Sequence, residues 1–267
     1  MSIEGRPDAE RSIATVHAAL DAGVTLIDTA DAYHLLPGEV GHNEELIARA
    51  LKTYGGDTAN VLVATKGGHL RPGDGTWTLD GRPEYLKEAA KASARRLGVE
   101  AIGLYQFHRP DPQVPYADSL GAIRDLLDEG VIQLAGISNA SVEQIDLANR
   151  ILDGRLVSVQ NQFSPTHTSS LAELEHCAAL GIAFLPWSPL GGIRNASELG
   201  ERHTAFAQVA ADHGVSPQQV TLAWELALAP VVIPIPGASR PASIQDSAKA
   251  AELALTAPEI AALTAAV

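Results

Sequence analysis

Residues 101–138 read AIGLYQFHRPDPQVPYADSLGAIRDLLDEGVIQLAGIS, a stretch that indicates the architecture of the whole chain. The runs 101–108 and 131–138 are almost continuously apolar or β-branched, which is typical of strands buried on both faces. The segment between them has a helical pattern of apolar residues and closes on Gly130, a common residue at helix ends. The stretch therefore predicts two parallel strands joined by a helix.

The same alternation continues in both directions along the 267 residues. Helical patterns separate seven predicted strands, at 23–30, 60–66, 101–108, 131–138, 156–163, 181–188 and 231–236. Such strands form parallel sheets with right-handed crossovers, either open and doubly wound or closed into a barrel. No G-x-G-x-x-G motif follows the first strand, so the regular spacing and the length favour an α/β fold of the (β/α)8 TIM-barrel type. No linker divides residues 1–267, and we expect a single domain.

The predicted strands are one fewer than the eight of a closed barrel. The segment MSIEGRP (1–7) has too few apolar residues to supply the missing strand. We therefore expect seven strands and an open barrel edge with unpaired backbone groups. We expect either a homo-oligomer that covers this edge or a protein that bound cofactor stabilises clearly.

The composition restricts the partners and the location of the protein. Thirty-two acidic residues against 19 Lys and Arg give a net charge of −13, which disfavours binding to nucleic acid or an anionic membrane. No apolar run approaches the ~18 residues that span a bilayer, and the N-terminus lacks the apolar region of a signal peptide. The single cysteine, Cys177, excludes an internal disulfide. We predict a cytoplasmic protein that acts on a small molecule.

Polar side chains stand at the carboxyl ends of the first three predicted strands. Asp28 ends the first strand and Tyr33 follows it, Lys66 ends the second and His108 ends the third. Each has an ordinary explanation alone: a helix cap or ion-pair partner, a rim aromatic, a solvated lysine and a structural histidine. Because active sites of barrels form at the carboxyl ends of the strands, one shared site explains all four together.

These four side chains form a coherent acid–base set. A phenol has an ordinary pKa near ~10, which is too high for a poised acid or base at neutral pH. A neighbouring ammonium lowers the pKa of the phenol, and a carboxylate keeps that ammonium charged. A nearby imidazole can donate to a carbonyl oxygen on which negative charge develops. The set fits a reaction at a carbonyl group.

Across residues 20–250 the chain resembles the aldo-keto reductases in a series of ordered motifs: GVTLIDTADAY, VLVATK, LYQFH, GISN, VQNQFS, LPWSPLGG and IPIPGASRP. The resemblance implies a (β/α)8 barrel that reduces aldehydes or ketones to alcohols by hydride transfer from NADPH. It places the catalytic tetrad on Asp28, Tyr33, Lys66 and His108. Tyr33 is then the proton donor, Lys66 lowers its pKa, Asp28 holds Lys66, and His108 orients the substrate. Relatives begin with a β-hairpin and a first strand, and we expect both to be absent here.

The resemblance also implies which residues bind the nicotinamide. Ser138, Asn139 and Gln160 correspond to the polar set around its carboxamide, and Trp187 to the aromatic that stacks on its ring. Core packing is the ordinary alternative for Trp187. Its place at a strand end beside SPLGG favours stacking.

The phosphate contacts carry over less completely. Ser188, Leu190 and Gly191 correspond to the pyrophosphate contacts. Several other positions between 237 and 247 depart from the family pattern, so Ser239 and Arg240 remain as partners for the adenosine 2′-phosphate. NADPH is the predicted cofactor, and NADH is the alternative.

Two other functions stay open. A metal-dependent hydrolase has nine histidines to draw on, but the chain shows neither H-x-H at a strand end nor H-E-x-x-H, and we predict no metal site. A cofactor-binding barrel that acts as a sensor or subunit with little turnover is the second alternative. Substrate selection by a reductase falls on loops, in which Trp77 and Leu79 either wall an apolar pocket or only support the loop. These loops are 34–41, 67–81, 108–116 and 190–202.

Overall fold

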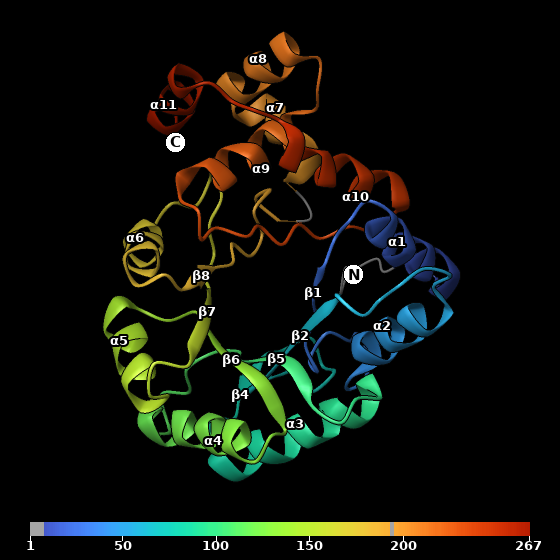
Figure 1. The fold of residues 1–267 in the computed structure, drawn as a ribbon, viewed down its shortest axis with the longest axis vertical. Coiled ribbons are helices and arrows are strands. Elements are labelled where there is room, and N and C mark those ends of the chain that lie inside the picture. The colour runs from blue at the N-terminus through green and yellow to red at the C-terminus, as the bar shows by residue number, and fades with distance from the viewer. Residues whose placement is uncertain (1–7, 193–194) are drawn as a thin grey trace.

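The computed structural model describes residues 8–192 and 195–267. Its main feature is a curled sheet of six parallel strands with helices on its outer side (Figure 1). In spatial order the strands are β1 (Leu26–Asp28), β2 (Leu62–Gly67), β5 (Ile102–Phe107), β6 (Ile132–Ser138), β7 (Leu156–Gln160) and β8 (Ala183–Phe184). The curled parallel sheet confirms the predicted α/β fold of barrel type, as a half-barrel within the described residues.

Helices follow the strands as the alternation predicts (Figure 1). The outer layer consists of α1 (Ala9–Asp21), α2 (His42–Thr53), α3 (Pro83–Leu97), α4 (Tyr116–Asp128), α5 (Val142–Ile151) and α6 (Leu171–Leu180). The C-terminal helices are α7 (Leu199–Arg202), α8 (Thr204–His213), α9 (Pro217–Leu228), α10 (Pro241–Ala248) and α11 (Ala257–Ala265). Helix α1 packs against both α2 and α10, so helices from distant parts of the chain are neighbours.

Six strands form the sheet instead of the seven that the sequence predicts. The run 231–236 forms only an isolated parallel bridge, between Val232 and Phe184. Ile233 and Ile235 donate to the carbonyls of Phe184 and Pro186 at 2.9 and 3.4 Å, but Pro234 and Pro236, which alternate with them, have no N–H to offer a strand on the other side. The prediction of a seventh strand was therefore wrong, although the segment does run beside β8.

Both edge strands are shorter than predicted. The run 23–30 contributes only Leu26–Asp28, and 181–188 contributes only Ala183–Phe184. Within the described residues β1 pairs with β2 alone, so one of its edges has no neighbouring strand. The predictions for MSIEGRP fall on residues 1–7, which lie outside the described part of the chain.

A small antiparallel hairpin inside the loop 67–81 was not predicted. Strand β3 (His69–Leu70) pairs with β4 (Thr78–Leu79), with His69 opposite Leu79. The Asp74 carboxylate accepts hydrogen bonds from the backbone N–H and hydroxyl of Thr76 at 2.9 and 2.6 Å. These bonds stabilise the turn, so the loop after β2 is an ordered element.

The core fills the space between the sheet and the surrounding helices. On β5, Ile102 and Phe107 are fully buried and belong to the same cluster as Leu120 and Ile123 of α4. At the C-terminal side, Trp224 of α9 stacks on Phe163 and meets Phe206 edge-on, with ring centroids 5.9 and 5.5 Å apart. Burying each such side chain stabilises the fold by about 1.5–3 kcal/mol. This packing fixes the strands whose carboxyl ends carry the polar residues.

Candidate active site

The four predicted catalytic residues lie together at the carboxyl ends of β1, β2 and β5. Asp28 ends β1, Lys66 lies near the end of β2, and His108 directly follows β5. Lys66 Nζ lies 2.5 Å from Asp28 Oδ2 and 3.3 Å from the hydroxyl of Tyr33. It also donates to the backbone carbonyl of Thr29 at 2.8 Å. These three hydrogen-bond partners of Lys66 are all oxygen atoms, which suits an ammonium that can only donate.

Lys66 is fully buried, so its charge depends on these partners. Burial by itself lowers the pKa of Lys66, but the Asp28 carboxylate and Tyr33 outweigh that effect and raise the pKa above its usual value. The ammonium is therefore charged at every physiological pH. The ion pair places this charge directly beside the Tyr33 hydroxyl.

The pKa of Tyr33 differs from the prediction in its direction. Burial raises the pKa of the phenol, and Asp28 raises it further, while the Lys66 ammonium lowers it. The net result is a pKa above the ordinary 10.0 rather than below it. The predicted effect of Lys66 is present but smaller than the cost of desolvating a phenolate. Tyr33 is thus protonated at neutral pH.

His108 faces the same place as Tyr33. Its ring centroid lies 5.8 Å from that of Tyr33, at an interplanar angle of 80°, and the side chain is buried. Burial, and then the charge of Lys66, lower the pKa of His108 well below 6.5. The imidazole is therefore neutral at pH 7. Its Nδ1 is buried and has no hydrogen-bond partner among the described residues.

The second oxygen of Asp28 is held by two glutamines. Gln106 Nε2 donates to Asp28 Oδ1 at 3.1 Å, and Gln160 Nε2 donates to the same oxygen at 2.9 Å. Sequence reasoning missed Gln106. The available signal was a polar side chain in an otherwise apolar strand, two residues before His108 and hence on the same side of β5.

The residues predicted around the nicotinamide also lie together, at the ends of β6, β7 and β8. The Ser138 hydroxyl donates to the backbone carbonyl of Gln160 at 2.7 Å. Asn139 Nδ2 donates to the carbonyl of His108 at 3.0 Å, and Asn139 Oδ1 accepts from Trp187 Nε1 at 3.2 Å. Asn139 adopts the left-handed conformation, with φ of 57°, which asparagine tolerates better than most residues.

This set fits a nicotinamide carboxamide. Ser138 and Gln160 are buried polar side chains, and Trp187, which donates to Asn139, is only partly buried. The carboxamide of nicotinamide requires hydrogen-bond donors and acceptors close together, and its ring can stack on the face of an aromatic side chain. The chain supplies both kinds of group beside Tyr33 and His108.

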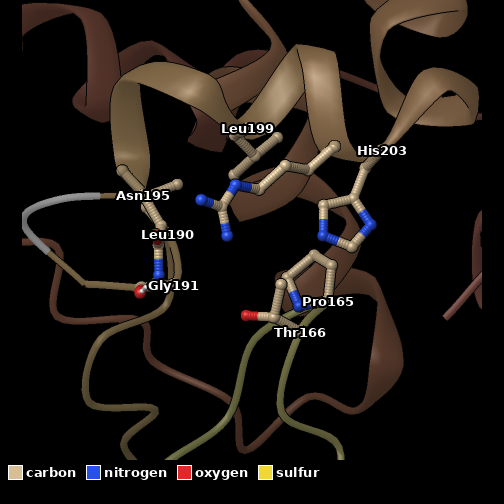
Figure 2. Close-up of a pocket in the computed structure, with 8 residues that line it drawn as sticks. Pro165, Thr166, Leu190, Gly191, Asn195, Leu199 and His203 are labelled. Carbon is tan, nitrogen blue, oxygen red and sulfur yellow. Dashed lines mark hydrogen bonds between the residues drawn. The ribbon is translucent and has the colours of Figure 1, made fainter.

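The predicted pyrophosphate residues form a loop after β8. Leu190 and Gly191 line a pocket that Figure 2 shows between this loop, the loop with Pro165 and Thr166, and the helical segment with Leu199. Ser188 adopts φ of 54° and accepts at its carbonyl from the N–H of Gly191 at 2.9 Å. The described part of this loop therefore has a compact turn whose glycine backbone faces the pocket.

The two predicted 2′-phosphate residues lie directly before α10. Arg240 is exposed, and its Nε donates to the Ser243 hydroxyl at 2.8 Å. No hydrogen bond given for the described residues joins Ser239 or Arg240 to the nicotinamide set. An exposed guanidinium suits a phosphate group.

Two further observations concern metal binding and membrane spanning. Among residues 8–192 and 195–267, no group of three His, Cys, Asp or Glu side chains has the arrangement of a metal site. In the same part of the chain no helix combines the length and the apolar character needed to cross a membrane.

Comparisons with known proteins agree with this geometry. The model of the Aldo/keto reductase family matches residues 1–267. An uncharacterized oxidoreductase of Schizosaccharomyces pombe is 37% identical over 256 residues, which are 96% of this chain and 79% of the relative. A 6-dehydroglucose reductase of Novosphingobium aromaticivorans is 34% identical over 243 residues, 88% of this chain and 78% of the relative.

The solved structures include a glycerol dehydrogenase of Gluconobacter oxydans with a TM-score of 0.83 and 26% sequence identity. The match covers 98% of this chain and 86% of that one. The predicted resemblance and the predicted enzyme class are both confirmed: the chain belongs to the aldo/keto reductase family of NAD(P)H-dependent oxidoreductases.

Proposed function

We propose that this protein reduces aldehydes or ketones to alcohols, with NADPH as the hydride donor and Tyr33 as the proton donor. The observation that carries the proposal is the contact series Asp28–Lys66–Tyr33, with distances of 2.5 and 3.3 Å, beside the ring of His108. A phenol held against a charged ammonium is suited to release a proton to a developing alkoxide.

Each of the four side chains has a separate role in this step. Tyr33 is protonated at neutral pH and donates its proton to the carbonyl oxygen. Lys66 stays charged and stabilises the phenolate that Tyr33 becomes. The neutral His108 donates a hydrogen bond to the same carbonyl oxygen and so orients the substrate. Asp28 keeps Lys66 in place.

The cofactor would be held by the residues on the next strand ends. Ser138, Asn139 and Gln160 would bind the carboxamide, and the face of Trp187 would stack on the ring. When bound, NADPH supplies the hydride that reduces the carbonyl carbon. Ser188, Leu190 and Gly191 would contact the pyrophosphate, and Ser239 and Arg240 the 2′-phosphate.

A sensor or subunit without turnover is the weaker proposal. Binding a dinucleotide requires no phenol held 3.3 Å from a fully buried ammonium, whereas proton donation does. The relative named as a 6-dehydroglucose reductase makes a polar aldehyde a reasonable first substrate to test.

The test is to incubate the protein with NADPH and each member of a panel of aldehydes and ketones. The decrease in NADPH absorbance measures the rate of reduction. We expect turnover with at least one member, and Tyr33→Phe lowers kcat by about 10²–10⁴-fold. The dissociation constant of NADPH stays unchanged, because the hydroxyl is not part of the proposed cofactor set. Tyr54→Phe is the control, because it removes a tyrosine hydroxyl that donates to Asp21 and to no residue of the tetrad. Full activity of Tyr33→Phe would overturn the assignment.

A further inference from the structure

Two arginines beside the tetrad have a feature that the other arginines of the described residues lack. The Nε atoms of Arg71 and Arg109 are buried and have no hydrogen-bond partner. Neither guanidinium forms an ion pair with an acid in residues 8–192 and 195–267, whereas Arg82, Arg96, Arg155 and Arg202 all do. A partly desolvated guanidinium without an anion is energetically costly, so a missing partner calls for explanation.

Each arginine is anchored next to a catalytic residue. Arg71 Nη1 donates to the carbonyl of His34 at 2.8 Å, and His34 follows Tyr33 in the chain. Arg109 follows His108, and its Nη2 donates to Asn139 Oδ1 at 3.1 Å. Each arginine thus uses one of its two terminal nitrogens. The other terminal nitrogen of each side chain makes no hydrogen bond with the described residues.

A series of aromatic rings connects the two positions. The ring of His69 lies 4.9 Å from that of His108 and 4.4 Å from that of Trp77, measured between centroids. Arg71 Cζ in turn lies 5.2 Å from the centroid of Trp77. A substrate whose carbonyl reaches Tyr33 would extend along these rings towards the guanidinium groups.

The positive charges next to this series of rings are those of Arg71 and Arg109. Burial, and then the charge of Arg109, lower the pKa of His69 to about 4, so His69 is neutral at pH 7, as is His108. Asp28 balances Lys66, which leaves the two arginines uncompensated. Among the acids of the adjoining loops, Asp80 pairs with Arg82, and Asp74, Asp111 and Glu39 accept hydrogen bonds from neutral donors. No ion pair among the described residues joins any of these acids to Arg71 or Arg109.

We propose that Arg71 and Arg109 bind an anionic group, a carboxylate or a phosphate, on the carbonyl substrate. The preferred substrates are then aldehydes or ketones that carry such a group at the end away from the carbonyl. A guanidinium fork matches the oxygens of both anions, and the bond is charge-assisted on both sides. This inference rests on the proposed function and names its substrate class.

The test uses pairs of aldehydes that differ in charge. 4-Carboxybenzaldehyde is compared with methyl 4-formylbenzoate, and glyceraldehyde 3-phosphate with glyceraldehyde. We expect kcat/KM to be at least about tenfold higher for the anion of one pair, which also tells carboxylate from phosphate recognition. Arg71→Gln and Arg109→Gln should lower kcat/KM for that anion by about 10–100-fold and change the neutral partner far less. Arg71→Lys should retain part of the preference.

Arg124→Gln on α4 is the control, because Arg124 lies on the helical surface next to Asp125. Equal kcat/KM for anion and neutral partner in both pairs would overturn the inference. So would an equal loss for both members of a pair in the variants, because a loss of hairpin structure alone would have that result.

A binding measurement separates this inference from the proposed function. 4-(Hydroxymethyl)benzoate, the alcohol formed from the first anionic probe, should raise the melting temperature of the wild type but not of Arg71→Gln. If no aldehyde is reduced, the proposed reduction fails, while this shift still decides whether the arginines bind a carboxylate. Inorganic phosphate serves in the same way for the phosphate arm. The absence of a shift with both ligands would overturn the inference.

Discussion

Gln160 Nε2 donates a hydrogen bond to Asp28 Oδ1 at 2.9 Å, although 132 positions separate the two residues. The bond joins the residues proposed for the nicotinamide to the carboxylate that holds Lys66. Gln106 Nε2 reaches the same oxygen at 3.1 Å, and its own Oε1 accepts from Ser158 at 3.4 Å. Residues of β5 and β7 therefore hold Oδ1 of Asp28, and Lys66 of β2 holds Oδ2.

Replacing Gln106 tests whether this support matters for the reaction. Gln106→Met removes one hydrogen bond to a charged carboxylate, which contributes about 1.5–3 kcal/mol. We expect kcat to fall by up to about tenfold, because part of that loss is relieved by movement of Asp28. KM for NADPH should change little. Gln208→Met on the surface of α8 is the matched control, and an unchanged kcat would mean that Gln160 alone holds the carboxylate.

The Asp28–Lys66 pair allows stability and catalysis to be separated. Lys66→Met leaves Asp28 as a nearly buried carboxylate without its counter-charge, and we expect a loss of about 3–5 kcal/mol in the free energy of unfolding. The double variant Asp28→Asn/Lys66→Met removes both charges, so it should recover most of the stability. Neither variant should recover kcat, because the charge beside Tyr33 is absent from both.

Urea unfolding and steady-state kinetics on the same preparations measure the two quantities. Recovery of kcat together with stability in the double variant would contradict the role of Lys66. It would show that the ion pair is structural only.

The sequence could predict that Asp28, Lys66 and His108 lie near one another because parallel strands bring their carboxyl ends together. Asp28 pairs with Ala64 and Lys66 pairs with Gln106, so each successive polar residue is only two positions further along the neighbouring strand. The alternation predicts parallel neighbouring strands whose carboxyl ends share one edge, whereas their register is an observation of the structure.

Properties that depend on burial were not predictable in the same way. The charges near Tyr33 are visible in the sequence, but the desolvation that raises its pKa comes from residues packed around it. The β3–β4 hairpin depends on contacts such as Arg71 with the His34 carbonyl, which connect two separate loops. Pro234 and Pro236, in contrast, are visible in the sequence, and they prevent the run 231–236 from pairing as a strand on both sides.

Arg240 provides a test of cofactor preference. Its exposed side chain lies directly before α10 and donates to the Ser243 hydroxyl. Arg240→Gln should weaken NADPH binding by about tenfold or more, because charge-assisted bonds contribute about 1.5–3 kcal/mol. NADH lacks the 2′-phosphate, so its dissociation constant should stay the same. Quenching of tryptophan fluorescence measures both constants, with Arg150→Gln as the control. Equal effects on the two cofactors would exclude a 2′-phosphate contact.

Asp31 makes stability depend on pH. Burial, and then the charge of Glu44, raise the pKa of Asp31 from 3.8 to about 8, against smaller lowering effects from Arg96 and Lys66. Between these two pH values the folded protein binds a proton that the unfolded chain has lost. The free energy of unfolding therefore decreases as pH rises through this window, by up to about 1.4 kcal/mol per pH unit.

Asp31→Asn removes that proton uptake. We expect the variant to gain stability relative to the wild type as the pH is raised from about 5 to about 8. Urea unfolding at several pH values measures the difference, and Asp118→Asn at an exposed position is the control. A difference between variant and wild type that is the same at every pH would show that Asp31 does not titrate in this range.

Glu225 of α9 is a second buried carboxyl group with a raised pKa, and no nearby charge lowers that pKa. The side chain is fully buried beside Trp224, and neither carboxyl oxygen has a hydrogen-bond partner among the described residues. Burial raises the pKa of Glu225 well above 4.5, so folding favours the neutral acid and stability again decreases as pH rises. Glu225→Leu replaces the unsatisfied carboxyl by an apolar group and should increase the free energy of unfolding by about 1–3 kcal/mol. Glu225→Gln keeps an unsatisfied polar group and should gain less, while Glu201→Leu on the surface should change little. A destabilised Glu225→Leu variant would reveal a polar partner for the carboxyl group that is absent from the described contacts.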